Sequence, residues 1–512
     1  MSDPGKQWAI VQGDARDVLA GMDDQSVQCV VTSPPYFGLR SYGTPALLWG
    51  GAPECQHEWA TSIPHPMRKS GKHGPASILA EGTKVAEHEV RIHSNLGQFC
   101  RLCGCWRGSL GLEPTPDCGA WAQGKREPYI SWEFDHDTQK EEPVIRWRRT
   151  EEIKLCGACY ICHLVAIFRE VRRVLRDDGT LWLNIAGCYA SQGGPEPAQT
   201  KWQVDGASNT QAAGKSRKAP KQFKPKDWVP IPWMLGMALQ ADGWWLRSPI
   251  IWAKGLSFCE SYSGSSMPES VRSRPSNTHE YLLLLTKSAR YFYDKEAVAE
   301  ESVTNDPRKP YGSDGAWLLD GRDKWEEGAG KAQERDASRR NLRSVWAINP
   351  ESLRQKHYAS FPTALVEPCI KAGTSERGCC PKCGKGWERI IERTGHINKR
   401  EPAHQPGNDP TKTDSTGWAP TSRATENWRP GCECCIDYSH TEISQEHLGP
   451  VPYEPVPCIV LDPFCGSGTT VMVALRLGRR AIGIDLSETY CEMARQRVID
   501  DCPMLNTPEE AT

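Results

Sequence analysis

Apolar and polar positions follow strand-like and helix-like spacing in turn along much of the chain. Residues 8–40 open with the apolar run "WAIVQGD", continue with helical spacing in "ARDVLAGM" and return to an apolar run in "SVQCVVTS". Residues 163–187 predict an amphipathic helix, an Asp-Gly turn and an apolar strand, and residues 232–254 repeat that order. "HEYLLLLTKSARYFYD" predicts one more apolar strand and a hairpin partner for it. Strands that alternate with helices in this way predict an α/β fold with a mostly parallel, doubly wound sheet.

The same spacing returns towards the C-terminus. "FPTALVEPCIKAG" predicts a helix that begins at Pro362 and ends at Gly373. The segment "CIVLDPFCGSGTTVMVALRLGRRAIGIDLSETYCEMARQRV" predicts a strand, a glycine-rich loop, a helix, a second strand that ends in Asp485, and a final helix. Elsewhere the spacing is lost, which divides the chain into core segments at 1–49, 163–295, 346–373 and 451–512, insertions at 50–162, 296–345 and 374–450, and a polar loop at 188–228.

Composition favours a globular protein with polar insertions. Apolar residues make up 38% of the 512 positions and charged residues 25%, and the formal net charge is −2. No run approaches the roughly 20 apolar residues of a membrane helix, and the N-terminus has no signal-peptide pattern. We therefore expect a cytoplasmic protein with no membrane partner. Basic runs at 146–149 and 215–226 are, each taken alone, typical of solvated loops.

The chain has 22 cysteines, and many of them stand in close pairs. In a reducing compartment such pairs predict zinc sites rather than disulfides. Cys55 and His57 combine with Cys100 and Cys103 in one predicted site, for which Cys105 is a substitute ligand. Four ligands leave no open position on the metal, so the expected role is structural.

A second site of the same kind is predicted from Cys380, Cys383, Cys432 and Cys434. Two neighbouring cysteines, Cys379 and Cys435, could replace one of these four ligands. A further group could form a third zinc site or could consist only of reduced, buried thiols: Cys118, Cys156, Cys159 and Cys162.

The glycine-rich loop "DPFCGSGTT", residues 462–470, predicts a cofactor site. Gly466 and Gly468 allow a tight turn and a close approach of the backbone to a ligand. Asp485 ends the next strand about 20 residues later, where a carboxylate binds ribose hydroxyls in doubly wound folds. The loop lacks the dinucleotide GxGxxG pattern and the lysine of a P-loop. We therefore expect a nucleoside-bearing cofactor without a triphosphate.

The second motif is "TSPPY", residues 32–36. An apolar strand through Val30 and Val31 runs into two prolines, which end it. Taken alone, the motif is typical of a simple strand stop. Its partnership with the C-terminal glycine loop favours a catalytic role.

Together the two motifs resemble the β group of DNA amino-methyltransferases, in which the catalytic motif also precedes the cofactor motif. The resemblance extends to "GDARDVLAGMDDQSVQCVVTSPPYFGLR", "VRRVLRDDGTLWLNIAG", "GWWLRSPIIWAK", "HEYLLLLTKSARYFYD" and "FPTALVEPCIKAGT", about three-fifths of the chain. It implies a circularly permuted Rossmann-like fold that uses S-adenosylmethionine to methylate N4 of cytosine or N6 of adenine in a base flipped out of double-stranded DNA. It also implies a bacterial or phage-encoded, nucleoid-associated enzyme, prophage-like in its insertions, with a cognate restriction endonuclease as a partner.

The resemblance assigns roles to segments and residues. Segment 1–49 would hold the catalytic half of the core, 451–512 the cofactor-binding half, 346–373 the cofactor-closing helix, and 296–345 the target-recognition region. The catalytic loop would comprise Ser33, Pro34, Pro35 and Tyr36. The cofactor would be bound by Asp14 near its adenine, Asp485 at its ribose, and Phe361, Pro362, Asp462, Pro463, Phe464, Gly466, Gly468 and Thr469 around its methionine moiety.

The expected chemistry is the alignment of a weakly nucleophilic amine with the methyl donor. The Ser33 hydroxyl and the Pro34 carbonyl would accept the two amino hydrogens, and Tyr36 would stack on the base. Serine at the first motif position resembles the N4-cytosine members, whereas aspartate is commoner in the N6-adenine members, some of which also carry TSPPY. N4 of cytosine is therefore favoured, and N6 of adenine is the alternative.

Two other functions receive less support. A C5-cytosine methyltransferase would need a Pro-Cys nucleophile after the cofactor motif, and both Pro-Cys pairs precede it. A zinc-bearing DNA-binding protein with a degenerate methyltransferase core would not need intact SPPY and glycine-loop motifs.

Overall fold

The computed structural model describes residues 7–38, 44–50, 54–60, 62–67, 86–91, 98–100, 102–103, 105–113, 116–117, 126–135, 140–149, 155, 159–190, 223–266, 268–301, 339–351, 361–394, 422–434 and 451–502. The chain divides into two compact units. One comprises 1–291, 344–370 and 459–512, and the other comprises 292–343 and 371–458. The first unit thus contains both the predicted core strands and the insertion 50–162.

The first unit is built on an eight-stranded sheet. Its strands, from one edge to the other, are β1 (Trp8–Gln12), β22 (Arg480–Asp485), β21 (Ile459–Asp462), β2 (Val27–Thr32), β11 (Leu175–Ile185), β15 (His279–Thr286), β14 (Trp245–Ala253) and β18 (Val345–Ala347). Every neighbouring pair is parallel except the two pairs that include β15. The predicted mostly parallel sheet is confirmed.

The prediction of a hairpin partner for β15 directly after it in the chain is wrong. The residues that follow, 287–298, contain turns and no strand. β15 lies instead between β11 and β14, and both pairings are antiparallel. Its four consecutive leucines, Leu282 to Leu285, are at most 5% exposed. A strand this apolar requires cover on both faces and neighbours on both sides, which a hairpin at the surface would not supply.

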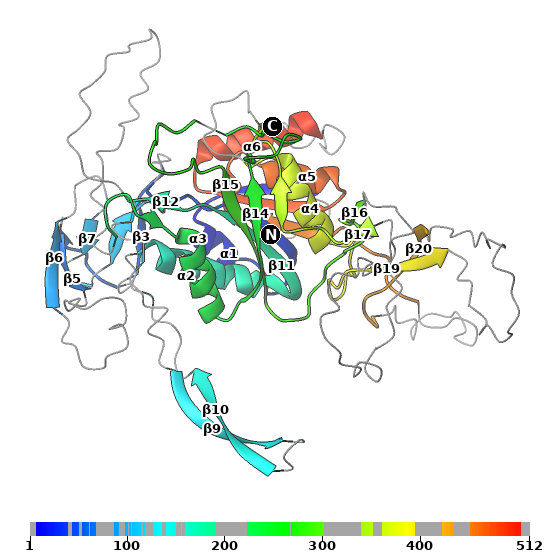
Figure 1. Ribbon diagram of the computed structural model, residues 1–512, viewed down its shortest axis with the longest axis horizontal. Helices are drawn as coiled ribbons and strands as arrows, with labels where there is room; N and C mark the ends of the chain where they lie inside the picture. Colours follow the sequence, from blue (N-terminus) through cyan, green and yellow to red (C-terminus); the bar gives the residue numbers. More distant parts are fainter. Residues whose placement is uncertain are drawn as a thin grey trace, which may run out of the picture. The chain divides into compact units, whose positions relative to one another are not determined.

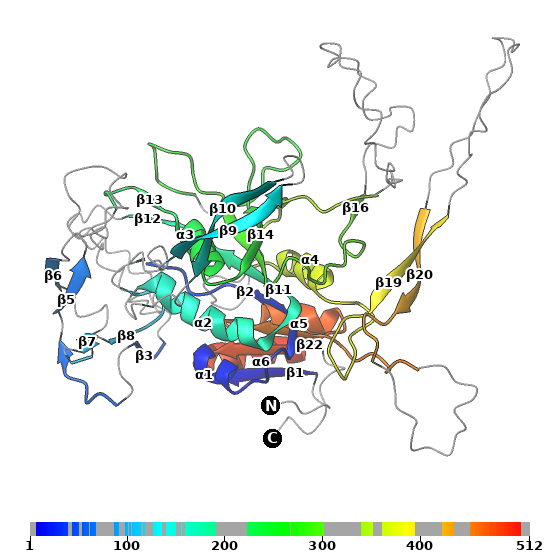
Figure 2. The same cartoon turned by 90° about the horizontal axis from the view of Figure 1, so that it is seen from below.

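Helices cover both faces of this sheet (Figure 1). On one face lie α1 (Ala15–Ala20), α2 (Tyr160–Val174) and α3 (Ile231–Ala241), of which α2 and α3 are side by side in both views (Figures 1 and 2). On the other lie α4 (Thr363–Gly373), α5 (Thr469–Arg476) and α6 (Glu488–Asp501). All six residues of β2 are buried, as expected of a parallel strand covered on both sides.

Strands from the two ends of the chain are interleaved in the sheet. β21 and β22, from the C-terminal segment, lie between β1 and β2, from the N-terminal segment. The order agrees with the predicted circular permutation of a Rossmann-like sheet. Because β2 and β21 are parallel neighbours, the SPPY loop and the glycine loop leave the sheet at the same edge. Ligands of doubly wound folds bind at such carboxyl ends, where the strand order changes direction.

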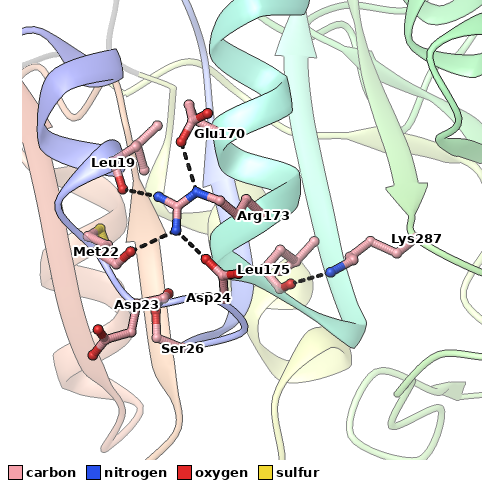
Figure 3. Close-up of polar contacts among 9 residues, drawn as sticks. All are labelled: Leu19, Met22, Asp23, Asp24, Ser26, Glu170, Arg173, Leu175 and Lys287. Atoms are coloured by element: carbon pink, nitrogen blue, oxygen red, sulfur yellow. Dashed lines mark hydrogen bonds and ion pairs between the residues drawn. The ribbon is translucent and has the colours of Figure 1, made fainter. Parts of the chain in front are cut away.

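Arg173 of α2 fixes the turn that leads into β2 (Figure 3). Its guanidinium donates to the carbonyl oxygens of Leu19 and Met22, at 2.6 and 2.8 Å, and pairs with Asp24 and with Glu170. The carbonyl groups at the end of a short helix need such donors. Arg173 therefore ties the end of α1 and the turn before β2 to α2.

Smaller sheets accompany the eight-stranded sheet, and some of them include strands of the insertion 50–162. The four-stranded antiparallel sheet has the order β3 (Leu47–Trp49), β8 (Trp106–Gly108), β7 (Gln98–Cys100) and β4 (Trp59–Ala60). Further two-stranded sheets are β5 (Ser62–Met67) with β6 (Ala86–Arg91), β9 (Arg126–Asp135) with β10 (Lys140–Arg149), β12 (Cys188–Tyr189) with β13 (Trp228–Val229), β16 (Glu300–Glu301) with β17 (Arg339–Arg340), and β19 (Glu388–Thr394) with β20 (Ser422–Arg429). Among the described residues no helix combines the length and apolar character needed to cross a membrane.

Candidate active site

A pocket opens at the carboxyl ends of β2, β21 and β22. It encloses about 1080 Å³, part of it open to solvent. The lining residues come from both ends of the chain and from the insertion: Gly13, Asp14, Ala15, Ser33, Pro34, Pro35, Tyr36, Thr44, Leu47, Trp49, Leu110, Ile167, Phe361, Pro463, Phe464, Cys465, Gly466, Ser467, Thr469, Asp485, Leu486 and Tyr490. The structure thus brings the complete SPPY loop and most of the glycine loop to one cavity.

Three of the predicted cofactor residues do not line the pocket: Pro362, Asp462 and Gly468. Gly468 has a left-handed backbone (φ 78°) at the start of α5, and a Cβ there would lie 2.9 Å from the Cβ of Ala494. Glycine is therefore required at this position for close packing of α5 on α6. The other predicted cofactor residues all border the cavity.

Asp462 lies beneath the pocket and joins its two loops. The carboxylate is 1% exposed and accepts hydrogen bonds from the hydroxyls of Thr32, at 2.6 Å, and Thr470, at 2.7 Å. It also accepts one from the backbone N–H of Phe464, at 3.1 Å. Thr32 directly precedes the SPPY loop, so this single carboxylate fixes the spacing between the catalytic and the cofactor loops.

Burial raises the pKa of Asp462 to about 6 from its usual 3.8. Because the folded protein binds this proton more tightly than the unfolded chain, this group adds stability at low pH and loses that contribution as pH rises from about 4 to about 6. At about 1.4 kcal/mol per pKa unit the change is about 3 kcal/mol. We expect the difference in unfolding free energy between wild type and Asp462→Asn to fall by that amount between pH 3 and pH 7 in denaturant titrations. A pH-independent difference would contradict this assignment.

Asp485 organises the opposite side of the glycine loop. Its carboxylate accepts the backbone N–H of Gly466 at 2.9 Å and that of Ser487 at 2.8 Å. Burial raises its pKa above the usual range, and these N–H groups oppose the shift. A carboxylate oxygen accepts more than one hydrogen bond, so both oxygens retain capacity for a ligand.

Asp14 caps α1 at the pocket wall. Its carboxylate accepts from the backbone N–H of Arg16 at 3.0 Å and pairs with the Arg16 guanidinium at 2.5 Å. The predicted adenine contact of Asp14 would thus be made by a carboxylate whose direction is already set by the arginine.

Tyr36 is held by a polar network that the sequence did not reveal. Its hydroxyl donates to Glu280 at 2.5 Å and accepts from the Asn184 amide at 2.8 Å. The Ser33 hydroxyl donates to it at 3.3 Å. Lys254 pairs with the other oxygen of Glu280. The ring of Tyr36 is therefore fixed in direction, as a stacking platform requires.

Weak signals for these partners exist in the sequence. Asn184 interrupts the apolar strand "LWLNI", and Glu280 opens the apolar strand "HEYLLLL". A polar side chain in a buried strand needs a hydrogen-bonding partner. Periodicity alone, however, does not show that both side chains meet Tyr36.

Glu280→Ala is expected to lower kcat about tenfold with a smaller effect on the affinity for the methyl donor. The variant leaves the Tyr36 hydroxyl without its acceptor and Lys254 without its counter-ion, a loss of about 1–3 kcal/mol. Steady-state methyl transfer and donor titrations measure the two effects. Glu492→Ala, on the exposed side of α6, is the matched control and should behave as wild type. An unchanged kcat for Glu280→Ala would show that Tyr36 needs no such support.

The first predicted metal set comes together in the structure. The ligand atoms of Cys55, His57, Cys100 and Cys103 lie within 4.8 Å of one another. Cys105, the predicted substitute, has its sulfur 3.5 Å from Nδ1 of His57. Burial opposes ionisation of Cys100, but hydrogen bonds from the backbone of Cys103, from His57 and from the backbone of Leu102 lower its pKa to about 5. A thiolate is the form of cysteine that binds metal.

The second set also comes together, in the other unit. The sulfurs of Cys380, Cys383, Cys432 and Cys434 lie within 4.8 Å of one another. The third group stays a prediction. Cys118 and Cys156 lie outside the described residues, as does the substitute ligand Cys435, whereas Cys159 and Cys162 are buried at the start of α2.

Comparisons with known proteins agree on one family. The sequence profile of a DNA methylase family matches residues 27–380 and 457–496. The Type II methyltransferase M.SmaI of Serratia marcescens is 26% identical over 490 residues, 96% of this chain and 90% of that protein. The Type II methyltransferase M.Cfr9I of Citrobacter freundii is 38% identical over 365 residues, 71% of this chain and 72% of that protein.

Solved structures show a more distant likeness. TTHA0409 of Thermus thermophilus, solved in complex with S-adenosyl-L-methionine, aligns with a TM-score of 0.36 and 15% identity. The alignment covers 96% of this chain and 94% of that one.

Proposed function

Since the chain belongs to the DNA methylase family of N4- and N6-amino-methyltransferases, we propose that it methylates N4 of a cytosine flipped out of double-stranded DNA, with S-adenosylmethionine as donor. The observation that carries the proposal is the pocket in which the SPPY loop faces the glycine loop. A donor held by one loop and a base held by the other would meet there.

The lining of the pocket fits S-adenosylmethionine, which supplies an electrophilic methyl group when bound. Phe464, Leu486 and Tyr490 offer apolar walls to a purine. Asp485, at the end of β22, offers acceptors to a ribose diol. Phe361 borders the cavity from the segment before α4, which fits its predicted place over the methionine moiety.

The catalytic loop offers acceptors for the target amine. The Tyr160 hydroxyl donates to the carbonyl oxygen of Pro35 at 2.7 Å, which anchors the loop to α2. The Pro34 carbonyl oxygen and the Ser33 hydroxyl oxygen would then each accept a hydrogen bond from one of the two amino hydrogens. This would direct the nitrogen lone pair at the methyl group, so that an N–C bond forms as the bond from the methyl group to the donor sulfur breaks. S-adenosylhomocysteine would leave, and the proton lost by the amine would pass to solvent. Alignment of this kind contributes several kcal/mol to rate enhancement.

The choice of cytosine rests on Ser33, which resembles the N4-cytosine members at the first position of the motif. The test is mass spectrometry of nucleosides hydrolysed from methylated DNA. N4-methylcytosine is the expected product. N6-methyladenine would overturn the choice of base and retain amino-methylation. No methylation of any DNA would favour the degenerate, zinc-bearing DNA-binding protein.

We also propose that both cysteine-rich sets bind structural zinc. Four ligands of each set converge, and cysteine with histidine is the donor set that zinc prefers. Metal analysis of the purified full chain should give about two equivalents.

The proposed partners follow from the Type II relatives. Double-stranded DNA is the substrate, which would place the enzyme at the nucleoid. A cognate restriction endonuclease would cut the same sequence when it is unmethylated. Segment 296–345 remains the proposed target-recognition region, although most of it lies outside the described residues.

A further inference from the structure

One wall of the cofactor pocket comes from the small sheet that β3 forms with strands of the insertion 50–162, the insertion that carries the first metal set. Four of the lining residues, Thr44, Leu47, Trp49 and Leu110, belong to β3 or to the loops that flank the β3–β8 pair. Leu110 belongs to the insertion, whereas the other three residues directly precede it. Leu47 and Trp49 are paired with β8 of the insertion, so the small sheet that they share is part of the active site.

Trp49 is the largest of these wall residues and is fixed from several directions. Its indole N–H donates to the carbonyl oxygen of Gly108 at 3.3 Å, and its ring stacks on His163 with centroids 4.2 Å apart. The guanidinium of Arg16 lies 3.9 Å from the same ring. Arg16 also pairs with Asp14, so Trp49 and Asp14 share one support at the pocket wall.

The sheet that holds Trp49 also holds one of the metal ligands, Cys100 at the end of β7. Trp49 pairs with Trp106 of β8, and Trp106 pairs with Phe99 of β7, the neighbour of Cys100. The backbone N–H of Cys100 donates to the carbonyl oxygen of Cys105, directly before Trp106, at 2.9 Å. A metal that joins Cys100 to Cys103 would close this turn and fix β8 against β7.

A buried stack of three aromatic rings, those of Trp49, His163 and Trp106, links the small sheet to α2. His163 of α2 stacks on Trp49 and also on Trp106, and the ring centroids of His163 and Trp106 are 5.3 Å apart. Its Nδ1 pairs at 2.9 Å with the Glu113 carboxylate, and both side chains are at most 2% exposed. Displacement of β8 would therefore disturb Trp49, His163 and α2 together.

The insertion also contacts the catalytic loop. The backbone N–H of Gly38, two residues after Tyr36, donates to the carbonyl oxygen of Gly111 at 2.9 Å. Gly111 has a φ of +87°, and a Cβ there would lie 3.1 Å from the Tyr36 carbonyl oxygen. The strands of the small sheet are only two or three residues long, and many small zinc modules fold only when they bind metal.

We infer that metal bound by Cys55, His57, Cys100 and Cys103 sets the affinity of the pocket for S-adenosylmethionine by holding Trp49 in the pocket wall. Trp106 is a positioning residue in this coupling, because it belongs neither to the pocket lining nor to the metal set. The inference rests on the proposed function and on zinc at this set. The second set, in the other unit, should have no such effect.

The test compares Cys103→Ser with Cys383→Ser in the full chain. Each replaces the second cysteine of a Cys-x2-Cys pair, one in each set. Both variants should lose about one equivalent of zinc. Isothermal titration calorimetry should show the dissociation constant for S-adenosylmethionine rising at least tenfold in Cys103→Ser and less than twofold in Cys383→Ser. Equal affinities in the two variants would overturn the inference. A wild type that binds no zinc or no S-adenosylmethionine would instead contradict the proposed function.

Trp106→Phe keeps the inference testable if Cys103→Ser does not fold. This variant should retain both zinc equivalents and the thermal midpoint within a few degrees, while its dissociation constant for S-adenosylmethionine rises several-fold. Wild-type affinity for S-adenosylmethionine in Trp106→Phe would show that the stack of Trp49, His163 and Trp106 does not couple the metal set to the pocket. Chelation of the folded wild type should weaken donor binding, and zinc should restore it. Full affinity of the zinc-depleted protein would contradict the coupling.

Discussion

Ser33→Ala is expected to lower kcat for methyl transfer by about 10²–10³-fold. The Ser33 residue lines the pocket, and its hydroxyl donates to the Tyr36 hydroxyl, so its oxygen keeps lone pairs that can accept from the target amine. Loss of one preorganised hydrogen-bonding group at a reacting centre costs about 10²–10³ in rate. The Pro34 carbonyl remains, so residual activity should persist.

Methyl transfer from labelled donor to DNA measures this effect, and calorimetry with S-adenosylmethionine separates it from donor binding. The donor affinity should stay within a few-fold of wild type. Ser26→Ala is the matched control, because its hydroxyl bonds the Asp23 carbonyl in an exposed turn away from the pocket. A Ser33→Ala enzyme with wild-type kcat would show that the amine is held by other groups.

Asp462→Ala is expected to reduce the free energy of unfolding by about 2–5 kcal/mol and to weaken donor binding strongly. The variant leaves the buried Thr32 hydroxyl without its acceptor and the Thr470 hydroxyl with only the Val31 carbonyl oxygen, at 3.1 Å. A buried group that loses its acceptor costs about 1–3 kcal/mol. The variant also frees the Phe464 backbone N–H at the pocket wall. The two functional loops would then no longer have a common support.

Denaturant titration and donor calorimetry measure the two effects separately. Asp500→Ala is the control, because this exposed carboxylate accepts from Gln496 on the same helix. Asp462→Asn is an intermediate case, since an amide keeps one acceptor oxygen but adds a donor. Wild-type stability of Asp462→Ala would show that the threonines find other partners.

The meeting of the two motifs could be predicted from the sequence because both follow buried strands. Val30 and Val31 before SPPY, and the run 459–461 before Asp462, have the apolar character of central parallel strands. Parallel strands present their carboxyl ends at one edge, so loops that follow them are brought together. The metal sets could be predicted for another reason. Two cysteines that are close in sequence are also close in space, so each pair supplies two neighbouring ligands whatever the surrounding fold.

Other contacts depend on register and packing, which periodicity does not encode. Glu280 reaches Tyr36 only because β15 runs antiparallel beside β11, and the sequence predicted a hairpin partner for β15 instead. Trp49 lines the pocket only because β3 pairs with β8, across an insertion without regular spacing. The resemblance predicts that Asp462 binds the cofactor, and this role stays a prediction. The sequence did not show that its buried carboxylate also bonds Thr32 and Thr470 and thereby joins the two loops.

The interleaving of β21 and β22 between β1 and β2 has a consequence for biosynthesis. Thr32 and its partner Asp462 are separated by 430 positions along the chain. At about 5–20 residues per second, a ribosome needs roughly 20–90 s to cover that distance. During this time the fully buried strand β2 lacks its neighbour β21, and such long-range pairing is slow and prone to aggregation. Methylation should therefore begin only after β21 has been synthesised and has paired with β2.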